Sequence, residues 1–276
     1  MRRDADNIDS RDIENPLLCT EVVNEMYENF KRIEEEIKID SNYMANQAHV
    51  NEKMRTILID WLIEVHLKFK MVPETLYLTV NIIDRYLQSK QVRRSKLQLL
   101  GVSALLVASK YEEIYPPEIR DLVYITDRAY NKHEILEMEQ SIINALQYNF
   151  TVPTVHSFLC RYLKAAHADR TMVQLSCYLA ERTLQEYAML KYAPSVVAAT
   201  AVLVARKSLN RHPWSPTLLK YTQYDECDLA SCLDEMQRYM SDAEPAAPGA
   251  ATQQAAQKKY SSPKFGSVSR THLCFY

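Results

Sequence analysis

Glycine is scarce in this sequence, which has only three glycines among its 276 residues. Tight β-hairpins and phosphate-binding loops rely on glycine, because glycine adopts positive φ at little steric cost. The glycine spacings of the Rossmann dinucleotide-binding and P-loop fingerprints do not occur in the chain. The scarcity therefore favours an all-α fold and argues against the common nucleotide-binding loops.

The chain also lacks a strong net charge and long apolar runs. Its formal net charge is −2 at pH 7, which gives no general attraction to nucleic acid or to an anionic membrane. No apolar run approaches the roughly 20 residues of a membrane-spanning helix, and the first residues lack the apolar core of a signal peptide. We therefore expect no nucleic-acid, membrane or small-molecule partner.

Paired cysteines are absent as well. The sequence holds six cysteines without a C-x-x-C pair, and its seven histidines lie at no ligand-like spacing from them. Because four of the cysteines lie within helical patterns, we interpret the six as reduced and mostly packing residues of an intracellular protein, and we expect neither a metal site nor a cofactor. No motif places a catalytic nucleophile, so the sequence predicts that the chain is not an enzyme.

A pattern of small apolar residues occurs twice in the chain. The run GVSALLVASK covers residues 101–110, and the run AATAVLVARK covers residues 198–207. The shift that aligns the two lysines at the ends of these runs also aligns Trp61 with Phe158. One shift that relates helical patterns along the whole chain predicts two structural repeats.

Each repeat is expected to contain five helices, separated by proline-marked turns. The alanine-rich third helix of each repeat is apolar on all sides, so we expect the other helices to pack around it. The expected helices cover residues 53–70, 73–89, 95–113, 117–124 and 132–147 in the first repeat, and 154–166, 170–189, 194–209, 215–221 and 226–240 in the second.

The expected domains follow from these patterns. An N-terminal segment, 1–43, contains an amphipathic helix, and the two repeats occupy 44–150 and 151–240. The remainder, 241–276, is a low-complexity tail rich in Ala, Pro, Gln, Ser and Lys, which we expect to be mobile at least as far as Gln257.

The first helix of the first repeat, MRTILIDWLIEVHLKFK, is apolar over more of its circumference than one buried stripe requires. Its charged side chains argue against complete burial. Two interpretations stay open: the extra apolar residues are core, or they present a groove to a partner. The residues in question are Met54, Ile57, Leu58 and Trp61.

Several long stretches resemble the cyclin box of mitotic, B-type cyclins: MRTILIDWLIEVHLKFK, TLYLTVNIIDRYL, LQLLGVSALLVASKYEEIYPPEI and ILEMEQSII. The resemblance covers roughly residues 43–240, and the helix CTEVVNEMYENFKRIEEE and the tail stretch KKYSSPKFGSVS are also similar. It implies the double five-helix fold of cyclins, which agrees with the repeat found above. It also implies a regulatory subunit that binds and activates a cyclin-dependent protein kinase as a heterodimer, in the nucleus and cytoplasm, at the entry into mitosis.

The resemblance assigns residues to this role. It implies that Lys110 and Glu139 bind the kinase backbone, and it places Leu99 among the hallmark kinase-binding positions. Tyr27 either contacts the kinase or packs on the second repeat. Arg55 and Asp84 are expected to form a buried ion pair of structural importance.

The resemblance also interprets the broad apolar helix as a docking site. It implies a hydrophobic patch for Arg-x-Leu substrates or inhibitors, in which an apolar groove takes the leucine and a carboxylate pairs with the arginine. The residues of this patch are Met54, Ile57, Leu58, Trp61, Glu64, Leu97 and Gln98.

Two questions stay open at this level. The same repeat occurs in transcription-type scaffolds that contact DNA, although the weak net charge speaks against that alternative. Mitotic cyclins also carry an N-terminal destruction segment, which we do not find here. A fragment, a shortened gene model and a cyclin removed by another route would each explain this.

Overall fold

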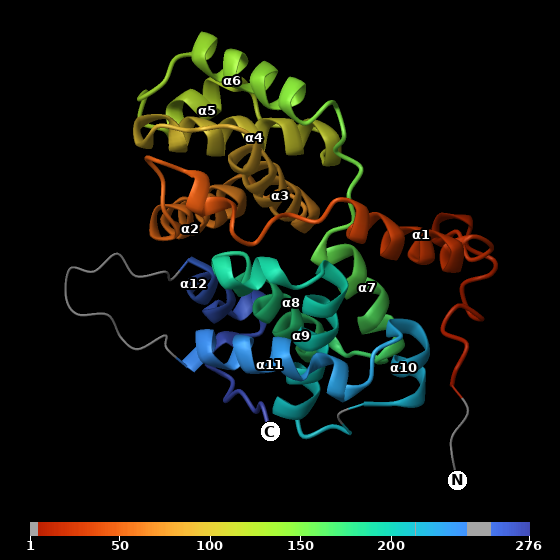
Figure 1. Cartoon of the computed structure of the whole chain (residues 1–276). Coiled ribbons are helices and arrows are strands. Elements are labelled where there is room, and N and C mark those ends of the chain that lie inside the picture. The colour runs from red at the N-terminus through yellow and green to blue at the C-terminus, as the bar shows by residue number, and fades with distance from the viewer. Residues whose placement is uncertain (1–4, 213, 242–254) are drawn as a thin grey trace.

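The computed structural model describes residues 5–212, 214–241 and 255–276, and the regular elements within them are all helical. Figure 1 shows two stacked bodies of helices, with α2–α6 above α7–α11. The first body contains α2 (Glu52–Phe69), α3 (Pro73–Ser89), α4 (Leu97–Glu112), α5 (Ile119–Ile125) and α6 (Lys132–Ala145). The second contains α7 (Val155–Ala165), α8 (Arg170–Thr183), α9 (Pro194–Ser208), α10 (Pro216–Thr222) and α11 (Glu226–Ser241).

Two further helices flank these bodies: α1 (Val23–Glu36) before them and α12 (Ala255–Ser261) after them. Short 3-10 helices occupy the connections, at Pro16–Leu18, Tyr43–Asn46, Arg94–Lys96, Tyr187–Lys191, Pro263–Phe265 and Val268–Arg270. No helix in the described part of the chain is both long and apolar enough to cross a membrane.

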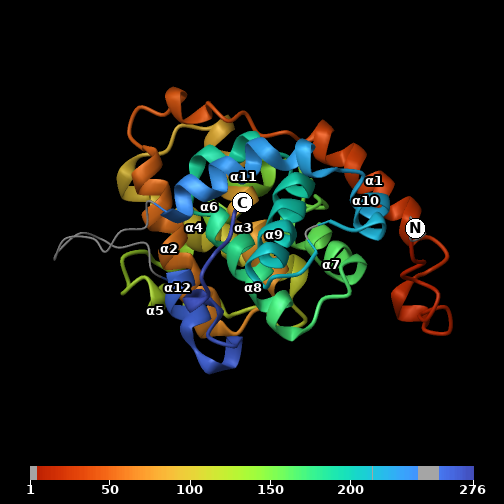
Figure 2. The same cartoon turned by 90° about the horizontal axis from the view of Figure 1, so that it is seen from below.

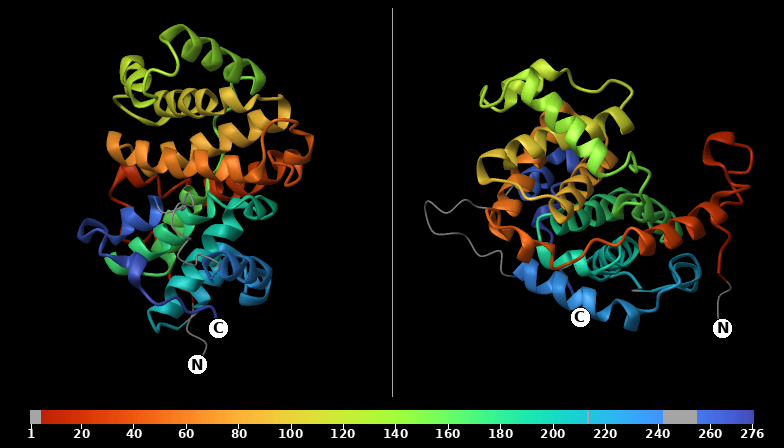
Figure 3. Two further views of the ribbon diagram at one scale, coloured as in Figure 1. Left: turned by 90° about the vertical axis from the view of Figure 1, so that its left-hand side faces the viewer. Right: turned by 45° about the horizontal axis from the view of Figure 1, so that its top comes forward.

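The all-α fold and the twofold repeat predicted from the sequence are confirmed. The same sequence shift that aligns Lys110 with Lys207 carries α5 onto α10 from end to end, and it aligns the first residues of α4 and α9. The left panel of Figure 3 shows the two bodies one above the other. Each body has its own apolar core, built around α4 in the first and α9 in the second.

The helices begin where the sequence places caps. The Asn51 side chain accepts a hydrogen bond from the Met54 amide at the start of α2, and Asn131 and Glu134 form a capping box on α6. Pro73 opens α3, where its missing N–H costs no hydrogen bond.

The predicted helix 170–189 is wrong at its end, because α8 stops at Thr183. Two side chains of α2 bind carbonyl groups just beyond that point. The Arg55 guanidinium donates to Leu184 O at 3.0 Å, and the Thr56 hydroxyl donates to Gln185 O at 2.9 Å. The carbonyl groups of Leu184 and Gln185 thus bond to side chains of the first repeat, at the positions where α8 would otherwise continue.

The N-terminal helix α1 packs on the second repeat. Glu34 accepts hydrogen bonds from both the backbone amide and the hydroxyl of Ser195, at the start of α9. Ahead of α1, Asp9 accepts two bonds from the buried Arg161 of α7, at 2.6 and 2.7 Å. Figure 2 shows α1 on the same side of the molecule as α7 and α10.

The expectation of a mobile tail is wrong from Ala255 onward; its earlier part, 242–254, lies outside the described residues. Helix α12 packs between α2 and α8, with Ala255 and Ala256 buried. Lys259 forms a buried ion pair with Glu181 at 2.6 Å, and Tyr260 donates to the same carboxylate at 3.0 Å. Ala255 and Ala256, two of the alanines that suggested low complexity, are small enough to permit this close helix packing.

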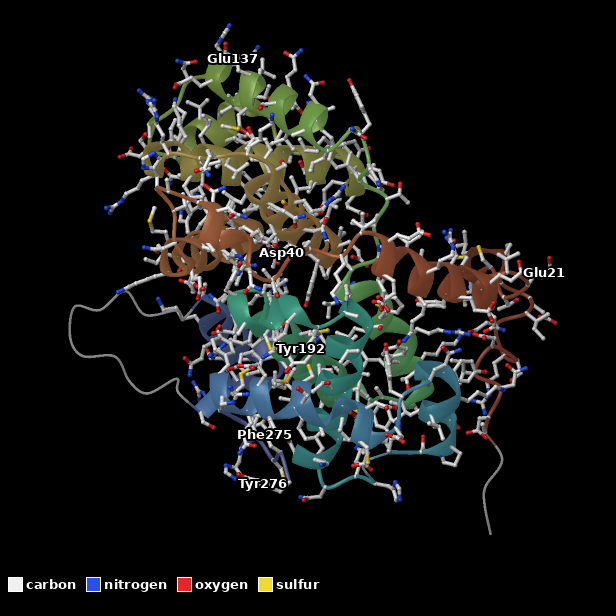
Figure 4. The ribbon with its side chains drawn as sticks, in the orientation of Figure 1. Glu21, Asp40, Glu137, Tyr192, Phe275 and Tyr276 are labelled. Atoms are coloured by element: carbon white, nitrogen blue, oxygen red, sulfur yellow. The ribbon has the colours of Figure 1, made fainter. Side chains whose placement is uncertain are left out.

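The chain after α12 continues across the second repeat. Val268 and Phe275 are buried in its core. Figure 4 labels Phe275 and Tyr276 at the lower edge of the molecule, close to α11. There the Gln237 amide donates to the Tyr276 hydroxyl at 2.6 Å.

Candidate functional site

The exposed face of α2 carries an apolar stripe that ends in a carboxylate. Met54, Ile57, Trp61 and Glu64 follow one another at helical spacing and therefore share this face. Ile57 is 44% exposed, and Met54 and Trp61 are partly buried. We call this face, together with Leu97 and Gln98 at the start of α4, the α2 groove.

The floor of the α2 groove is made of residues that belong to the core. Leu58 and Leu97 are only 5% and 6% exposed, and both pack in the apolar core of the first repeat. Gly101 of α4 permits the close approach of the two helices, because an added Cβ would lie 2.7 Å from Leu58 Cδ1. The packing of α2 on α4 thus places the buried Leu58 and Leu97 beneath the partly exposed residues of the predicted patch.

The breadth of the apolar surface on α2 has a second cause that the sequence analysis missed. Ile59 and Ile63, on another face of α2, are fully buried against a cluster that includes Ala255 and Ala256 of α12. Leu62, on a third face, is buried in the first repeat. Helix α2 therefore buries apolar residues against two neighbours and still presents Ile57 to solvent.

Lys110 and Glu139 form an ion pair between α4 and α6, with 2.6 Å between Lys110 Nζ and Glu139 Oε1. The lysine side chain is 49% exposed, whereas the glutamate is 10% exposed. Exposed apolar side chains follow directly after α4: Ile114 is 88% and Tyr115 91% exposed. The sequence analysis did not single out these two, although apolar residues beside two consecutive prolines were a usable signal.

Two of the expected kinase-binding residues lie elsewhere. Leu99 is 3% exposed and packs in the core of the first repeat, so its side chain offers little surface for the direct kinase contact that the resemblance implies. Tyr27 follows the packing alternative. Its hydroxyl donates to Ser157 O at 2.9 Å, and its ring lies against Phe158 of α7. Burial raises the pKa of Tyr27 to about 12.

Arg55 and Asp84 form the expected buried pair between α2 and α3. The guanidinium donates twice to the carboxylate, at 2.6 and 2.7 Å, and both side chains are 1% exposed. The Tyr43 hydroxyl donates to the same carboxylate at 2.7 Å. Burial opposes the charge on Arg55, but the Asp84 carboxylate outweighs it and raises the pKa of the guanidinium above its usual value.

The described residues include no group of three or more His, Cys, Asp or Glu side chains that could hold a metal ion. The candidate site therefore comprises the Lys110–Glu139 pair between α4 and α6 and the partly exposed apolar residues of α2.

Comparison with known proteins identifies the family. The family models for the cyclin N-terminal domain and the cyclin C-terminal domain match residues 25–151 and 153–273. The chain is 48% identical to Cyclin-B2-1 of Oryza sativa subsp. japonica over 271 residues, which is 98% of this chain and 63% of the relative. It is 51% identical to Cyclin-B1-3 of Arabidopsis thaliana over 227 residues, 82% of this chain and 55% of the relative.

These relatives are longer than the chain, which spans roughly three fifths of the length of the curated proteins that it matches. Among solved structures, a viral cyclin from herpesvirus saimiri has a similar fold, with a TM-score of 0.69 and 21% identity. That match covers 79% of this chain and 99% of the viral one. Two cyclin domains in tandem, together with this identity to B-type cyclins, show that the chain belongs to the cyclin family.

Proposed function

We propose that the chain is the regulatory subunit of a mitotic cyclin-dependent protein kinase, which it binds and activates in the nucleus and cytoplasm. The observation that carries this proposal is the Lys110–Glu139 pair, together with the exposed Ile114 and Tyr115 that follow Lys110 in the chain just after the end of α4. The B-type cyclin relatives support it, and they do not favour the transcription-type alternative.

The Lys110–Glu139 pair suits recognition of a protein backbone. A half-exposed lysine keeps free N–H donors while it holds the carboxylate, so the pair offers both donors and acceptors to peptide groups that a docked kinase helix leaves unpaired. Ile114 and Tyr115 supply apolar area that would be removed from water in a complex. We expect an interface above about 2,000 Å², as in many signalling assemblies.

Catalysis in such a complex belongs to the kinase. A regulatory subunit that pushes the regulatory helix of the kinase inward completes the Lys–Glu ion pair that orients ATP. The proposal therefore assigns ATP and magnesium to the partner, and it assigns positioning alone to this chain.

The α2 groove is proposed to recruit substrates or inhibitors that carry an Arg-x-Leu element. Its partly exposed rim at Met54, Ile57 and Trp61 and its apolar floor suit a leucine side chain, and the exposed Glu64 can pair with the arginine.

Activation is tested by measuring histone phosphorylation by a purified monomeric cyclin-dependent kinase, with and without this chain. The combined substitution Lys110→Ala with Glu139→Ala should reduce both binding and activation. The matched control Lys96→Ala breaks a second surface ion pair that also reaches α6, in which Lys96 Nζ lies 2.8 Å from Glu134, while it leaves the Asn131–Glu134 capping box in place. Unchanged activation by the first variant, or equal loss in both, would remove the pair from the interface.

Recruitment is tested with two substrates, a short generic peptide and a longer one bearing Arg-x-Leu. Combining Met54→Ala with Trp61→Ala should spare the first activity and reduce the second. Leu67→Ala is the control, since Leu67 is 37% exposed on the same helix and lies outside the α2 groove. Equal loss on both substrates would mean that the rim serves only the fold.

A further inference from the structure

The α2 groove is electrically polarised along its length. We infer that its ligand is a peptide in which acidic residues follow the Arg-x-Leu element by a fixed spacing. This inference rests on the proposed docking function, and it adds a chemical requirement beyond Arg and Leu.

One end of the groove is acidic. Glu64 lies at the C-terminal end of the exposed stripe and is itself exposed. Asp60, one turn earlier, is occupied by the fold, since it accepts hydrogen bonds from the Gln185 amide at 2.6 Å and from the Ala255 backbone at 3.0 Å. Glu64 is therefore the carboxylate available to an incoming arginine.

The opposite end is basic. An open hollow there is lined by His49, Arg93, Arg94 and Ser95. The hollow borders the groove through the chain itself: Arg94 opens the 3-10 helix that runs directly into Leu97, and His49 lies two residues before the N-cap of α2.

Cations outnumber anions at this end. In the two segments that meet there, 48–54 and 90–96, the one acidic residue is Glu52, whereas Lys53, Lys90, Arg93 and Arg94 are all exposed. Lys96 differs, because Glu134 already holds its ammonium at 2.8 Å. The hollow therefore presents excess positive charge to the part of a bound peptide that extends beyond the Met54 end of the α2 groove.

The two charged ends fix a register for the ligand. Met54 and Glu64 are ten positions apart in α2, which corresponds to about 15 Å along a helix. An extended peptide covers this distance in roughly four to five residues. With its arginine at Glu64 and its leucine in the groove, the peptide reaches the basic hollow at about the fifth residue after the arginine.

This polarity also gives the ligand a direction. A peptide bound in reverse would bring its acidic residues to Glu64 and its arginine to Arg93 and Arg94, so both ends would repel it. The charges thus select one orientation of a ligand whose leucine alone would not define it.

The test uses fluorescence anisotropy with the whole purified chain and three synthetic peptides of equal length. The first carries Arg-x-Leu with glutamates at the fifth and sixth positions after the arginine. The second has glutamines there, and the third has the two glutamates moved to just before the arginine. The first peptide should bind about threefold to tenfold more tightly than the second at about 50 mM salt, and the difference should shrink at about 0.5 M salt. The third should show no gain.

Charge variants of the protein complete the test. Combining Arg93→Gln with Arg94→Gln should abolish the advantage of the first peptide while leaving the affinity for the second unchanged. Combining Lys264→Gln with Arg270→Gln removes two exposed cations from the C-terminal segment, and should preserve the advantage. Equal affinities for the first and second peptides, or for the first and third, would overturn the inference and leave the docking function intact. Failure of all three peptides to bind would overturn both.

Discussion

Removal of Arg55 should be among the most damaging single substitutions in this chain. The side chain makes two bonds to Asp84 and one to Leu184 O, so it joins α2, α3 and the end of α8. In Arg55→Leu the Asp84 carboxylate stays buried with the Tyr43 hydroxyl as its remaining partner among the bonds described above. A buried charge left without its partner costs about 3–5 kcal/mol, and we expect a loss of that size in the free energy of unfolding.

The assay is urea unfolding of the free chain, followed by helical circular dichroism and by tryptophan fluorescence. The control is Arg32→Ala, which breaks an ion pair with Glu36 on the exposed face of α1. The partners of that pair are four residues apart and well exposed, so its loss should cost only about 0.3–0.5 kcal/mol.

A second variant separates loss of charge pairing from loss of packing. Combining Arg55→Leu with Asp84→Leu removes both charges and should recover much of the stability, because replacement of a buried pair by apolar residues is often close to neutral. A loss below about 1 kcal/mol for Arg55→Leu alone would refute the reasoning. A double variant whose free energy of unfolding is lower than that of Arg55→Leu by about a further 3–5 kcal/mol would also refute it.

Three other predictions concern stability. Gly101→Ala should cost about 1–3 kcal/mol in urea unfolding and weaken Arg-x-Leu peptide binding, since the new Cβ displaces Leu58 from the groove floor; unchanged affinity would show that Leu58 yields freely. Lys259→Ala should cost about 3–5 kcal/mol by leaving Glu181 buried without its cation, and should speed amide exchange in α12; protected α12 amides would contradict this. Burial lowers the pKa of His66, so the folded state resists its protonation and stability should fall as pH drops below about 6.5; His66→Gln should flatten this dependence, and an unaltered slope would exclude His66 as its source.

The helices of the two repeats could be predicted from the sequence because they follow from periodicity, prolines and caps. The expected helix 73–89 matches α3 from end to end, and most of the other ends lie within two residues of their expected positions. These signals are local, and each repeat contains its own core. The end of α8 could not be predicted, since it depends on Arg55 and Thr56 from a distant helix.

The tail and the candidate site were harder to predict, because they too depend on contacts between residues far apart in the sequence. Ala255 and Ala256 carry no apolar stripe of their own, and their burial follows from the shape of α2 and α8, which composition does not encode. Family resemblance placed Leu99 beside Lys110 as a kinase contact, but it does not say which way a side chain points. The helical register turns Leu99 into the core and leaves Lys110 half exposed.

The packing of α12 against α2 has a consequence for how the chain is made. The Ala255 backbone donates to Asp60, 195 positions earlier in the sequence. Ile59 and Ile63 are therefore synthesised long before α12, the helix that packs against them. At synthesis rates of about 5–20 residues per second, that interval lasts roughly 10–40 seconds, far longer than a helix needs to form. During this time the nascent first domain exposes an apolar helix face, and a chaperone that binds such faces would find it there and lose it once α12 docks.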